Sequence, residues 1–182
     1  MNASLVVNFK KLKHYPVTII VLFIFFILNN SVQAENFLST NIQADYMLLE
    51  KSSKRLTLFS DEKVLKSYRV ALGRNPEGPK LVKGDKRTPE GRYIIDSRNP
   101  DSKYHLSLHI SYPNEIDREI AGIAGVSSGG NIMIHGIGDE YAWMGKFHAV
   151  LNWTDGCIAV TNEEIEEIWR LVPDGTAIEI RP

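Results

Sequence analysis

The stretch "WTDGCIAVTNEEIEEIWRLV", residues 153–172, contains the chain's only cysteine, followed by its clearest helix. Thr161 and Glu164 are spaced as a capping box, in which each side chain accepts a hydrogen bond from the backbone N–H of the other residue. Apolar side chains then recur on one helical face, at Ile165, Ile168, Trp169 and Val172. The stretch predicts a short apolar segment around Cys157 that leads into an amphipathic helix packed on a core.

Outward from this helix, the chain is a series of short runs typical of strands. The runs are "ADYMLLEKSS", "KRLTLFSD", "KVLKSYRVALG", "RYIIDS", "HLSLHISY", "NIMIHG" and, after the helix, "TAIEI". Asp61 and Glu62 are expected to form a tight turn between antiparallel neighbours. "NEIDREIAGIAG" favours a short helix with Ile116, Ile120 and Ile123 on one face. The pattern predicts a mainly β single domain, sandwich-like or barrel-like, with a C-terminal capped α-helix.

A long loop is expected from Gly73 to Gly91, "GRNPEGPKLVKGDKRTPEG". Its glycines and prolines are too dense for a regular helix or strand. Loops longer than about 12–15 residues inside a compact domain are often functional. We therefore expect this loop to border the functional site.

Residues 1–34 are typical of an export signal. Lys10, Lys11 and Lys13 form a basic region, and residues 17–28 are an uncharged apolar run before the small-x-small pattern Val32-Gln33-Ala34. The run has 28 − 17 + 1 = 12 residues, whereas a membrane-spanning helix needs about 20. Cleavage after Ala34 is expected, with an uncleaved N-terminal anchor as the alternative, which would be the only route to the membrane.

The predicted mature chain has 182 − 34 = 148 residues, the usual size of one domain. The leader carries three lysines and no acidic residue, so the 21 basic and 22 acidic residues become 18 and 22, a net charge of about −4. This balance provides no basic field for nucleic acid. The hydrophobic and charged fractions, 43% and 24%, are those of an ordinary globular protein.

Cys157 has no second cysteine with which to form an internal disulfide. In an exported protein, a lone cysteine pairs between molecules, acts as a reactive thiol, or is buried and inert. A nucleophilic cysteine needs a base or a cation nearby, because its free pKa is about 8.5. A zinc site is disfavoured, since such sites usually need three or four ligands at recognisable spacing.

Four histidines follow the leader. His105 and His109 share one face of a predicted strand, for which a structural role is favoured. His148 lies in a predicted loop and is the weaker candidate for a base. His135 ends a buried strand just before Gly136, at a rim that a substrate can approach, although a structural role remains an alternative.

The sequence around His135 and Cys157 resembles the L,D-transpeptidase catalytic domain (YkuD) family. His135 lies in "IMIHG", and Cys157 follows 157 − 135 = 22 positions later in "WTDGCIAV", just before the capped helix. That family pairs a histidine before glycine with a cysteine in a "[S/T]-x-G-C" motif. The segments "YMLLEKSSKRLTLF", "YRVALGRNPEGPK", "GDKRTPEGRYII" and "TAIEIRP" are also similar to the family's strands and loops, in the family's order. The resemblance places the catalytic domain at residues 44–182, after a short segment at 35–43.

The resemblance implies that Cys157 is the nucleophile and His135 the general base. It also implies that the backbone N–H groups of Gly156 and Cys157 face the tetrahedral intermediate, with Thr154 beside the site. The implied substrate is the peptide stem of peptidoglycan, attacked at the carbonyl of the L-centre of diaminopimelate through a thioester. No metal or organic cofactor is expected.

Two positions depart from the family pattern. Asp155 stands where many members have histidine, and Ala159 where many have arginine. An arginine suits a carboxylate, so Arg74, Lys80 or Arg87 of the long loop is expected to supply that charge, with solvated loop residues as the alternative. Gly136 and Asp155 complete the predicted supports of the site, and Trp153 is a further predicted substrate contact.

"TDGCIAVTNEEI" resembles an exported branch of the family from Gram-negative bacteria, which implies a periplasmic location. Because some members of that branch cut linkages, hydrolysis remains an alternative to transpeptidation. The amine released from diaminopimelate would then be a D-amino acid or an attached protein. A chemically inert cell-wall binding domain on the same fold is the third alternative.

Overall fold

The computed structural model describes residues 42–182, so the predicted signal segment, residues 1–34, lies outside the described residues. Residues 43–182 form one compact unit. None of the helices in the described part of the chain is long and apolar enough to cross a membrane.

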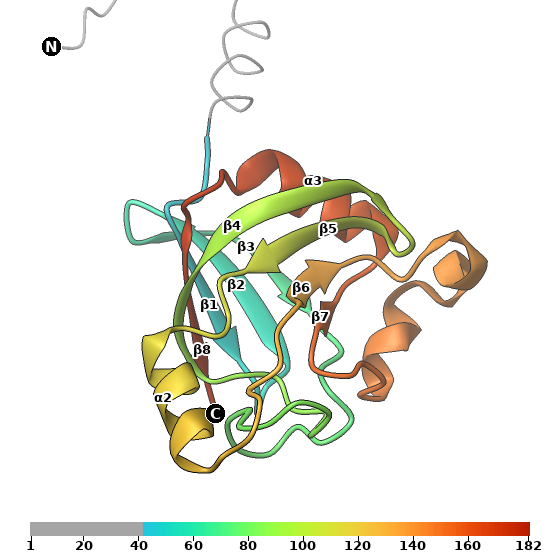
Figure 1. The fold of residues 1–182 in the computed structure, drawn as a ribbon. Helices are drawn as coiled ribbons and strands as arrows, with labels where there is room; N and C mark the ends of the chain where they lie inside the picture. Colours follow the sequence, from blue (N-terminus) through green and yellow to red (C-terminus); the bar gives the residue numbers. More distant parts are fainter. Residues whose placement is uncertain (1–41) are drawn as a thin grey trace, which may run out of the picture. The chain divides into compact units, whose positions relative to one another are not determined.

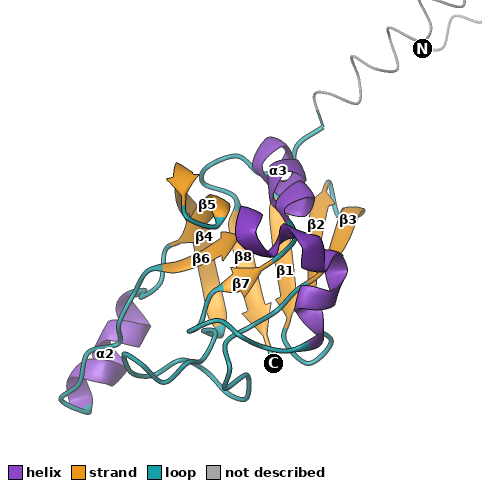
Figure 2. Ribbon diagram, turned by 90° about the vertical axis from the view of Figure 1, so that its right-hand side faces the viewer, coloured by secondary structure: helices purple, strands orange, loops and turns teal. Residues whose placement is uncertain are grey.

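Eight strands form a single curled sheet, drawn in Figures 1 and 2, in the order β3-β2-β1-β8-β4-β5-β6-β7. The strands are β1 (Tyr46–Glu50), β2 (Arg55–Ser60), β3 (Lys63–Arg69), β4 (Gly91–Ser102), β5 (His105–Ile110), β6 (Ile132–His135), β7 (Ile158–Ala159) and β8 (Ala177–Arg181). β1–β8 and β6–β7 are parallel pairs, and the other neighbours are antiparallel. The predicted mainly β architecture is confirmed.

The two edges of the sheet are joined by the chain that leaves β3. Ala71 exchanges backbone hydrogen bonds with Ala159 of β7, both at 2.9 Å, and Arg74 donates its N–H to the Thr154 carbonyl at 3.0 Å. Since β3 and β7 are the two edge strands, this crossing curls the sheet around one core. It also brings the start of the long loop beside the Cys157 segment.

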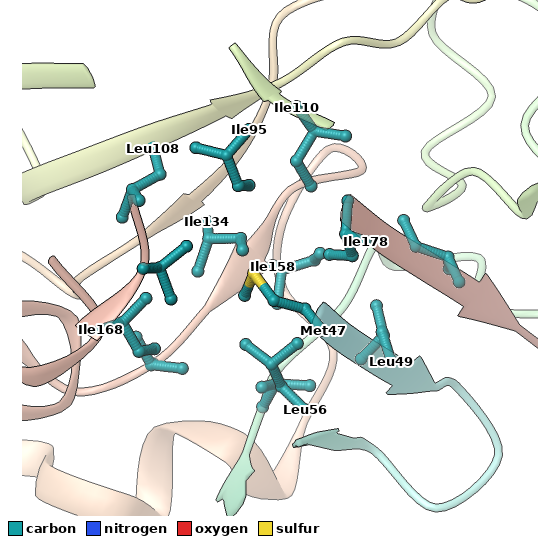
Figure 3. Packing of buried hydrophobic residues seen from close by; sticks show 14 of the residues in the cluster. Met47, Leu49, Leu56, Ile95, Leu108, Ile110, Ile134, Ile158, Ile168 and Ile178 are labelled. Carbon is teal, nitrogen blue, oxygen red and sulfur yellow. The ribbon is translucent and has the colours of Figure 1, made fainter. Parts of the chain in front are cut away.

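The concave side of the sheet holds the core. Apolar side chains from strands far apart in the sequence meet there, as Figure 3 shows for Met47, Leu49, Leu56, Ile95, Leu108, Ile110, Ile134, Ile158, Ile168 and Ile178. The tight turn at Asp61 and Glu62 is confirmed, with both residues at positive φ between β2 and β3. The loop from Gly73 to Gly91 has no helix or strand before β4, as expected.

The helix α3 (Asn162–Leu171) begins at the predicted capping box. The Thr161 side chain accepts from the Glu164 N–H, and the Glu164 carboxylate accepts from the Thr161 N–H. Ile165, Ile168 and Val172 are fully buried against the sheet. The packed helix thereby holds in place the chain that follows β7, a strand that ends two residues after Cys157.

The helix α2 (Glu115–Ile123) forms where it was predicted, but its isoleucine stripe does not face the core. Ile116, Ile120 and Ile123 are 65%, 46% and 82% exposed. The helix projects from the sheet (Figure 2), and its other face is tied down by Asp117, which accepts a hydrogen bond from the Tyr93 hydroxyl at 3.0 Å. Helical spacing predicted the helix correctly, and the structure shows that its isoleucines face outward.

The segment η2 (Asp139–Val150) consists of two helical pieces of the 3₁₀ type, joined at Gly145, where φ is 49°. Its His148 was expected in a loop, and the structure instead buries it, together with Ala149, in helical backbone. The apolar residues around His148 do not alternate as they would in a strand, which favoured a loop. In the structure, two short helical turns pack the C-terminal end of this segment against the domain.

Candidate active site

Cys157 lies directly before β7, at one edge of the sheet. It is a free cysteine, and its thiol donates a hydrogen bond to the Asn131 carbonyl with a sulfur–oxygen distance of 3.6 Å. The side chain lines a pocket of about 520 Å³. The thiol is therefore placed at the wall of a pocket large enough for part of a peptide.

Thr154 holds the turn that presents Cys157. Its hydroxyl donates to the Cys157 carbonyl at 2.7 Å and accepts from the Gly156 N–H at 3.1 Å. The Gly156 N–H is thus engaged inside the turn, which corrects the expectation that it faces an oxyanion. A buried N–H takes the nearest acceptor, and the Cys157 N–H remains as the candidate oxyanion donor.

Gly156 is required by both backbone conformation and space. Its φ is +131°, and an added Cβ would lie 2.6 Å from the Arg87 carbonyl oxygen of the long loop. Gly156→Ala should therefore lower the free energy of unfolding by about 2–3 kcal/mol, from backbone strain and the clash together. Denaturant unfolding of both proteins measures this.

Gly84→Ala is the matched control for that variant. Gly84 also has a positive φ, +85°, but no atom lies within 4 Å of the position of an added Cβ. The Gly84→Ala variant should therefore lose only the conformational part of the unfolding free energy, about 1–2 kcal/mol. A loss at Gly156 no larger than the loss at Gly84 would contradict the role of the loop contact.

His135 ends β6 and is almost fully buried. Its Nδ1 lies 2.6 Å from the Gly136 carbonyl oxygen, and because a carbonyl only accepts, Nδ1 carries the hydrogen and Nε2 is left as the proton acceptor. Tyr104 stacks on the ring with centroids 4.5 Å apart, and Trp153 meets it edge-on at 5.9 Å. These contacts fix both the tautomer and the plane of the imidazole.

The register of two parallel strands brings Cys157 and His135 together. His135 is paired with Ala159, two residues after Cys157, while Ile134 and Ile158 are paired in the core. Side chains two apart share a face, so Cys157 and His135 are diagonal neighbours, with Cα atoms roughly 8 Å apart from strand rise and spacing. In the described structure, the thiol hydrogen bond goes to Asn131 and not to His135.

Burial keeps both groups neutral at rest. It raises the pKa of the Cys157 thiol, to which Asp155 adds, while the Met133 N–H and Lys80 act in the opposite direction. Burial also lowers the pKa of His135, against the Gly136 hydrogen bond, which favours the charged ring. A resting thiolate–imidazolium pair is therefore disfavoured, and the pair suits proton transfer that accompanies bond formation.

The long loop borders the site, as expected. The pocket of Cys157 is lined on the loop side by Lys80, Lys83, Gly84 and Lys86, and elsewhere by residues that include Asn131 and Asp155. No salt bridge engages Lys83 or Lys86 within residues 42–182. These two lysines are the cations available to a ligand, and they were missed in a loop with several candidate charges.

The three cations predicted for carboxylate binding have structural partners instead. Arg74 forms an ion pair with Asp155 at 3.2 Å and donates to the Trp153 carbonyl. Lys80 is buried against Asp85 at 2.8 Å. Arg87 donates to the Pro79 carbonyl at 3.4 Å. These contacts help to hold the loop and the cysteine turn, and a role of the three cations in substrate binding stays a prediction.

Two supports of the site were not found from the sequence. Tyr104 covers His135, and Asn162 accepts hydrogen bonds from the N–H groups of Ile137 and Gly138, which fixes the chain just after the histidine. An added Cβ on Gly136 would lie 2.6 Å from the Asn162 amide oxygen. The position of Asn162, first in the helix after the cysteine strand, was the available signal.

His105 and His109 stand apart from the reaction centre. His105 contacts the Glu166 carboxylate at 2.7 Å, and His109 contacts Asp96 at 2.6 Å, as surface pairs. Within residues 42–182 no three His, Cys, Asp or Glu side chains are grouped as metal ligands.

A family model described as the L,D-transpeptidase catalytic domain (YkuD) matches residues 44–180. YafK of Escherichia coli K12 is 30% identical over 133 residues, which are 70% of this chain and 46% of YafK. YqjB of Bacillus subtilis is 28% identical over 139 residues, 74% of this chain and 70% of YqjB. Both are named as candidate L,D-transpeptidases.

The helical cell shape determining protein Pgp2 of Campylobacter jejuni has a similar structure. The TM-score is 0.57 at 24% identity, over 77% of this chain and 48% of Pgp2, a likeness of fold. The chain spans about half the length of YafK and of Pgp2. The mainly β domain has a histidine at the end of β6 and a cysteine directly before β7, the parallel neighbour of β6. This arrangement agrees with the family match, and the chain belongs to the L,D-transpeptidase catalytic domain family.

Proposed function

We propose that the protein is a cysteine acyltransferase of the L,D-transpeptidase type that acts on peptidoglycan stem peptides through a thioester on Cys157. The observation that carries the proposal is the placement of Cys157 beside His135, whose Nδ1 is held by Gly136 so that Nε2 is free to accept a proton. Membership of the family supports the substrate class.

In the first half-reaction, the Cys157 thiol turns from Asn131 towards the carbonyl carbon of the diaminopimelate L-centre. The sulfur–carbon bond forms as His135 Nε2 takes the thiol proton, and the Cys157 N–H stabilises the oxyanion. The carbon–nitrogen bond then breaks, and His135 returns the proton to the leaving amine. The product is a neutral thioester and a free amine.

In the second half-reaction, an acceptor amine gives a proton to His135 and attacks the thioester. The new amide bond forms as the carbon–sulfur bond breaks, and the proton returns to Cys157. Water in place of the amine completes the same sequence as hydrolysis. Hydrolysis is favoured by one feature, the exposed carboxylate of Asp155, which lines the pocket of Cys157 and can hold a water molecule.

Lys83 and Lys86 suit the carboxylates of a stem peptide. Replacing both with glutamine should raise KM for an anionic stem tetrapeptide about tenfold, with kcat within a factor of two, because the charges bind substrate and transition state alike. Steady-state kinetics at low and at high salt measures this, and the effect should shrink as salt rises.

Lys63 and Lys66 of β3, outside this pocket, provide the control for the lysine pair. The same double replacement there should leave KM unchanged. An equal rise in KM for both pairs would indicate a general charge effect and contradict a binding role for Lys83 and Lys86.

The full-length protein incubated with defined tetrapeptide muropeptides and an added D-amino acid tests the proposal. Intact-protein mass spectrometry should detect an acyl adduct on Cys157, and product analysis should detect exchanged or cross-linked stems. Shortened stems with the same adduct would assign hydrolysis. Sacculi that carry attached proteins are the next substrate in that case.

Absence of both adduct and product on all substrates, with binding to sacculi retained, would instead support an inert cell-wall binding domain. We further propose export to the periplasm of a Gram-negative bacterium, in keeping with the signal expected at residues 1–34. Cell fractionation with detection of the mature N-terminus tests this, and recovery of the protein only from the cytosol would contradict it.

A further inference from the structure

The turn between β4 and β5 covers the general base. It consists of Lys103 and Tyr104, and the Tyr104 ring stacks on the His135 imidazole, with centroids 4.5 Å apart and an angle of 25° between the planes. The turn also packs closely on the chain after the histidine, since an added Cβ on Gly136 would lie 2.7 Å from the Tyr104 carbonyl oxygen. The plane of the His135 ring therefore depends on where this turn is held.

His105, the residue after the turn, connects the turn to two other elements. Its Nε2 lies 2.7 Å from the Glu166 carboxylate of α3, and its Nδ1 lies 3.5 Å from the Asp139 carboxylate at the start of η2. A neutral imidazole donates through one nitrogen, so the doubly protonated ring is the form that donates towards both carboxylates. His105 therefore ties the turn to α3 and to η2.

The backbone of His105 is also unusual. Its φ is +76°, a left-handed conformation that is uncommon for residues other than glycine. Such a conformation persists where the surrounding contacts compensate for its cost. Loss of the side-chain contacts of His105 should therefore let the turn relax.

The Asp139 carboxylate belongs to the frame that holds the general base. It accepts a hydrogen bond from the Asn162 side-chain amide at 3.2 Å. The oxygen of the same amide accepts from the two backbone N–H groups that fix the chain just after His135. Through Asp139, His105 thus ties Tyr104 to the side chain that also positions the backbone of His135.

The exposure of this cluster decides where its effect should be seen. The Asp139 and Glu166 side chains are 90% and 56% exposed, and ion pairs between exposed groups add little to stability. The geometry of a reacting group is more sensitive, because a displacement of about 1 Å can lower a rate about 10²-fold. The contacts of His105 should therefore matter more for kcat than for folding.

We propose that His105 is a positioning residue of the enzyme, which holds Tyr104 against the His135 imidazole through its contacts with Asp139 and Glu166 and so keeps the base in its reactive plane. The inference rests on the proposed acyl transfer and adds to it a residue outside the reaction centre.

His105→Ala should lower kcat for a stem tetrapeptide about tenfold, with KM within a factor of two, because the base is loosened and the pocket of Cys157 is unchanged. The melting temperature should fall by no more than about 4 °C, as expected for exposed ion pairs. His105→Gln, which keeps an N–H donor for one carboxylate, should recover part of kcat.

His109→Ala is the matched control for these variants. His109 lies on the same strand as His105 and also pairs with a carboxylate at the surface, that of Asp96. Its replacement should leave kcat within a factor of two. Equal losses of kcat at the two histidines would contradict a positioning role that is particular to His105.

A double-mutant cycle on kcat tests whether His105 acts through Tyr104. Tyr104→Leu should lower kcat at least as much as His105→Ala does. In the protein that already carries Tyr104→Leu, the additional change His105→Ala should lower kcat by no more than about twofold, because the ring that it holds is gone. Losses that multiply in the double variant would overturn the route through Tyr104.

An NMR measurement tests the positioning without any turnover. In the Cys157→Ala protein, which cannot form a thioester, the additional change His105→Ala should shift the resonances of the His135 ring, because the stacked Tyr104 ring moves. The additional change His109→Ala should leave these resonances in place. Unmoved His135 resonances in the His105 variant would overturn the inference. Shifted resonances, with no amine released from any stem peptide by the wild-type protein, would support the positioning and contradict the acyl transfer.

Discussion

Cys157→Ala should abolish release of the amine from stem peptides, with a rate below about a thousandth of the wild-type rate. Alanine has no atom that can form the thioester, and other groups of the site cannot replace a covalent nucleophile. The check is product formation from tetrapeptide muropeptides over hours, with intact-protein mass spectrometry to show that the acyl adduct is absent.

The same variant should stay folded. The Cys157 side chain is only partly buried, and its hydrogen bond to the Asn131 carbonyl is long, at 3.6 Å, so its loss should change the unfolding free energy by less than about 1 kcal/mol. A variant that is folded, binds stem peptides and has no turnover establishes the nucleophile. Unchanged turnover in the folded variant would rule out the proposed mechanism.

His135→Gln should reduce kcat by about 10²–10⁴-fold, the usual contribution of a positioned general base. The glutamine side chain can fill part of the space between Tyr104 and Trp153, but it cannot take the thiol proton. His109→Gln is the control, since His109 pairs with Asp96 at the surface and should leave kcat unchanged. Similar losses of kcat in both variants would indicate that the His135 substitution acts by disturbing the structure and not by removing a general base.

The pH profile supplies an independent test of the same residue. The pKa of His135 is lowered from its ordinary value of 6.5, mainly by burial, so the neutral, proton-accepting ring persists below pH 6.5. In the wild-type protein, kcat/KM should accordingly hold at pH 6.5 and fall only at lower pH, where the ring becomes protonated. A fall centred above pH 6.5 would contradict the buried, neutral base.

Local signals in the sequence predicted much of the site. The order and spacing of "IMIHG" and "WTDGCIAV" indicated that Cys157 and His135 act together, and the register of β6 with β7 places them on one face. The expected border between the long loop and the site is also found, at Lys83 and Lys86. These signals are reliable because strand ends, glycine turns and capping boxes depend on residues a few positions apart.

These local signals could not predict the side-chain partners of the loop cations, which depend on how the loop folds. Arg74, Lys80 and Arg87 were expected to face substrate, and each is engaged by a group that the loop or the sheet crossing brings beside it. The loop holds several cations within a few positions. Which of them face a pocket depends on where the loop lies, and hydrophobic period and charge counts carry no information about that.

The sequence by itself determined the mainly β class and the helix α3 with its cap, and it predicted that the lone cysteine acts together with His135. Only the tertiary structure decided that the Thr154 hydroxyl accepts from the Gly156 N–H and that the isoleucines of α2 face outward. It also decided that the His148 ring is buried beside Tyr104 and Trp153, with no hydrogen-bond partner for its nitrogens among residues 42–182. The physical reason is the distance along the sequence between the residues that interact. Caps and turns are fixed by neighbours along the chain. Burial and hydrogen-bond partners are fixed by segments far apart in the sequence that meet when the sheet curls, such as β1 and β8, where Tyr46 pairs with Ala177, 177 − 46 = 131 positions later.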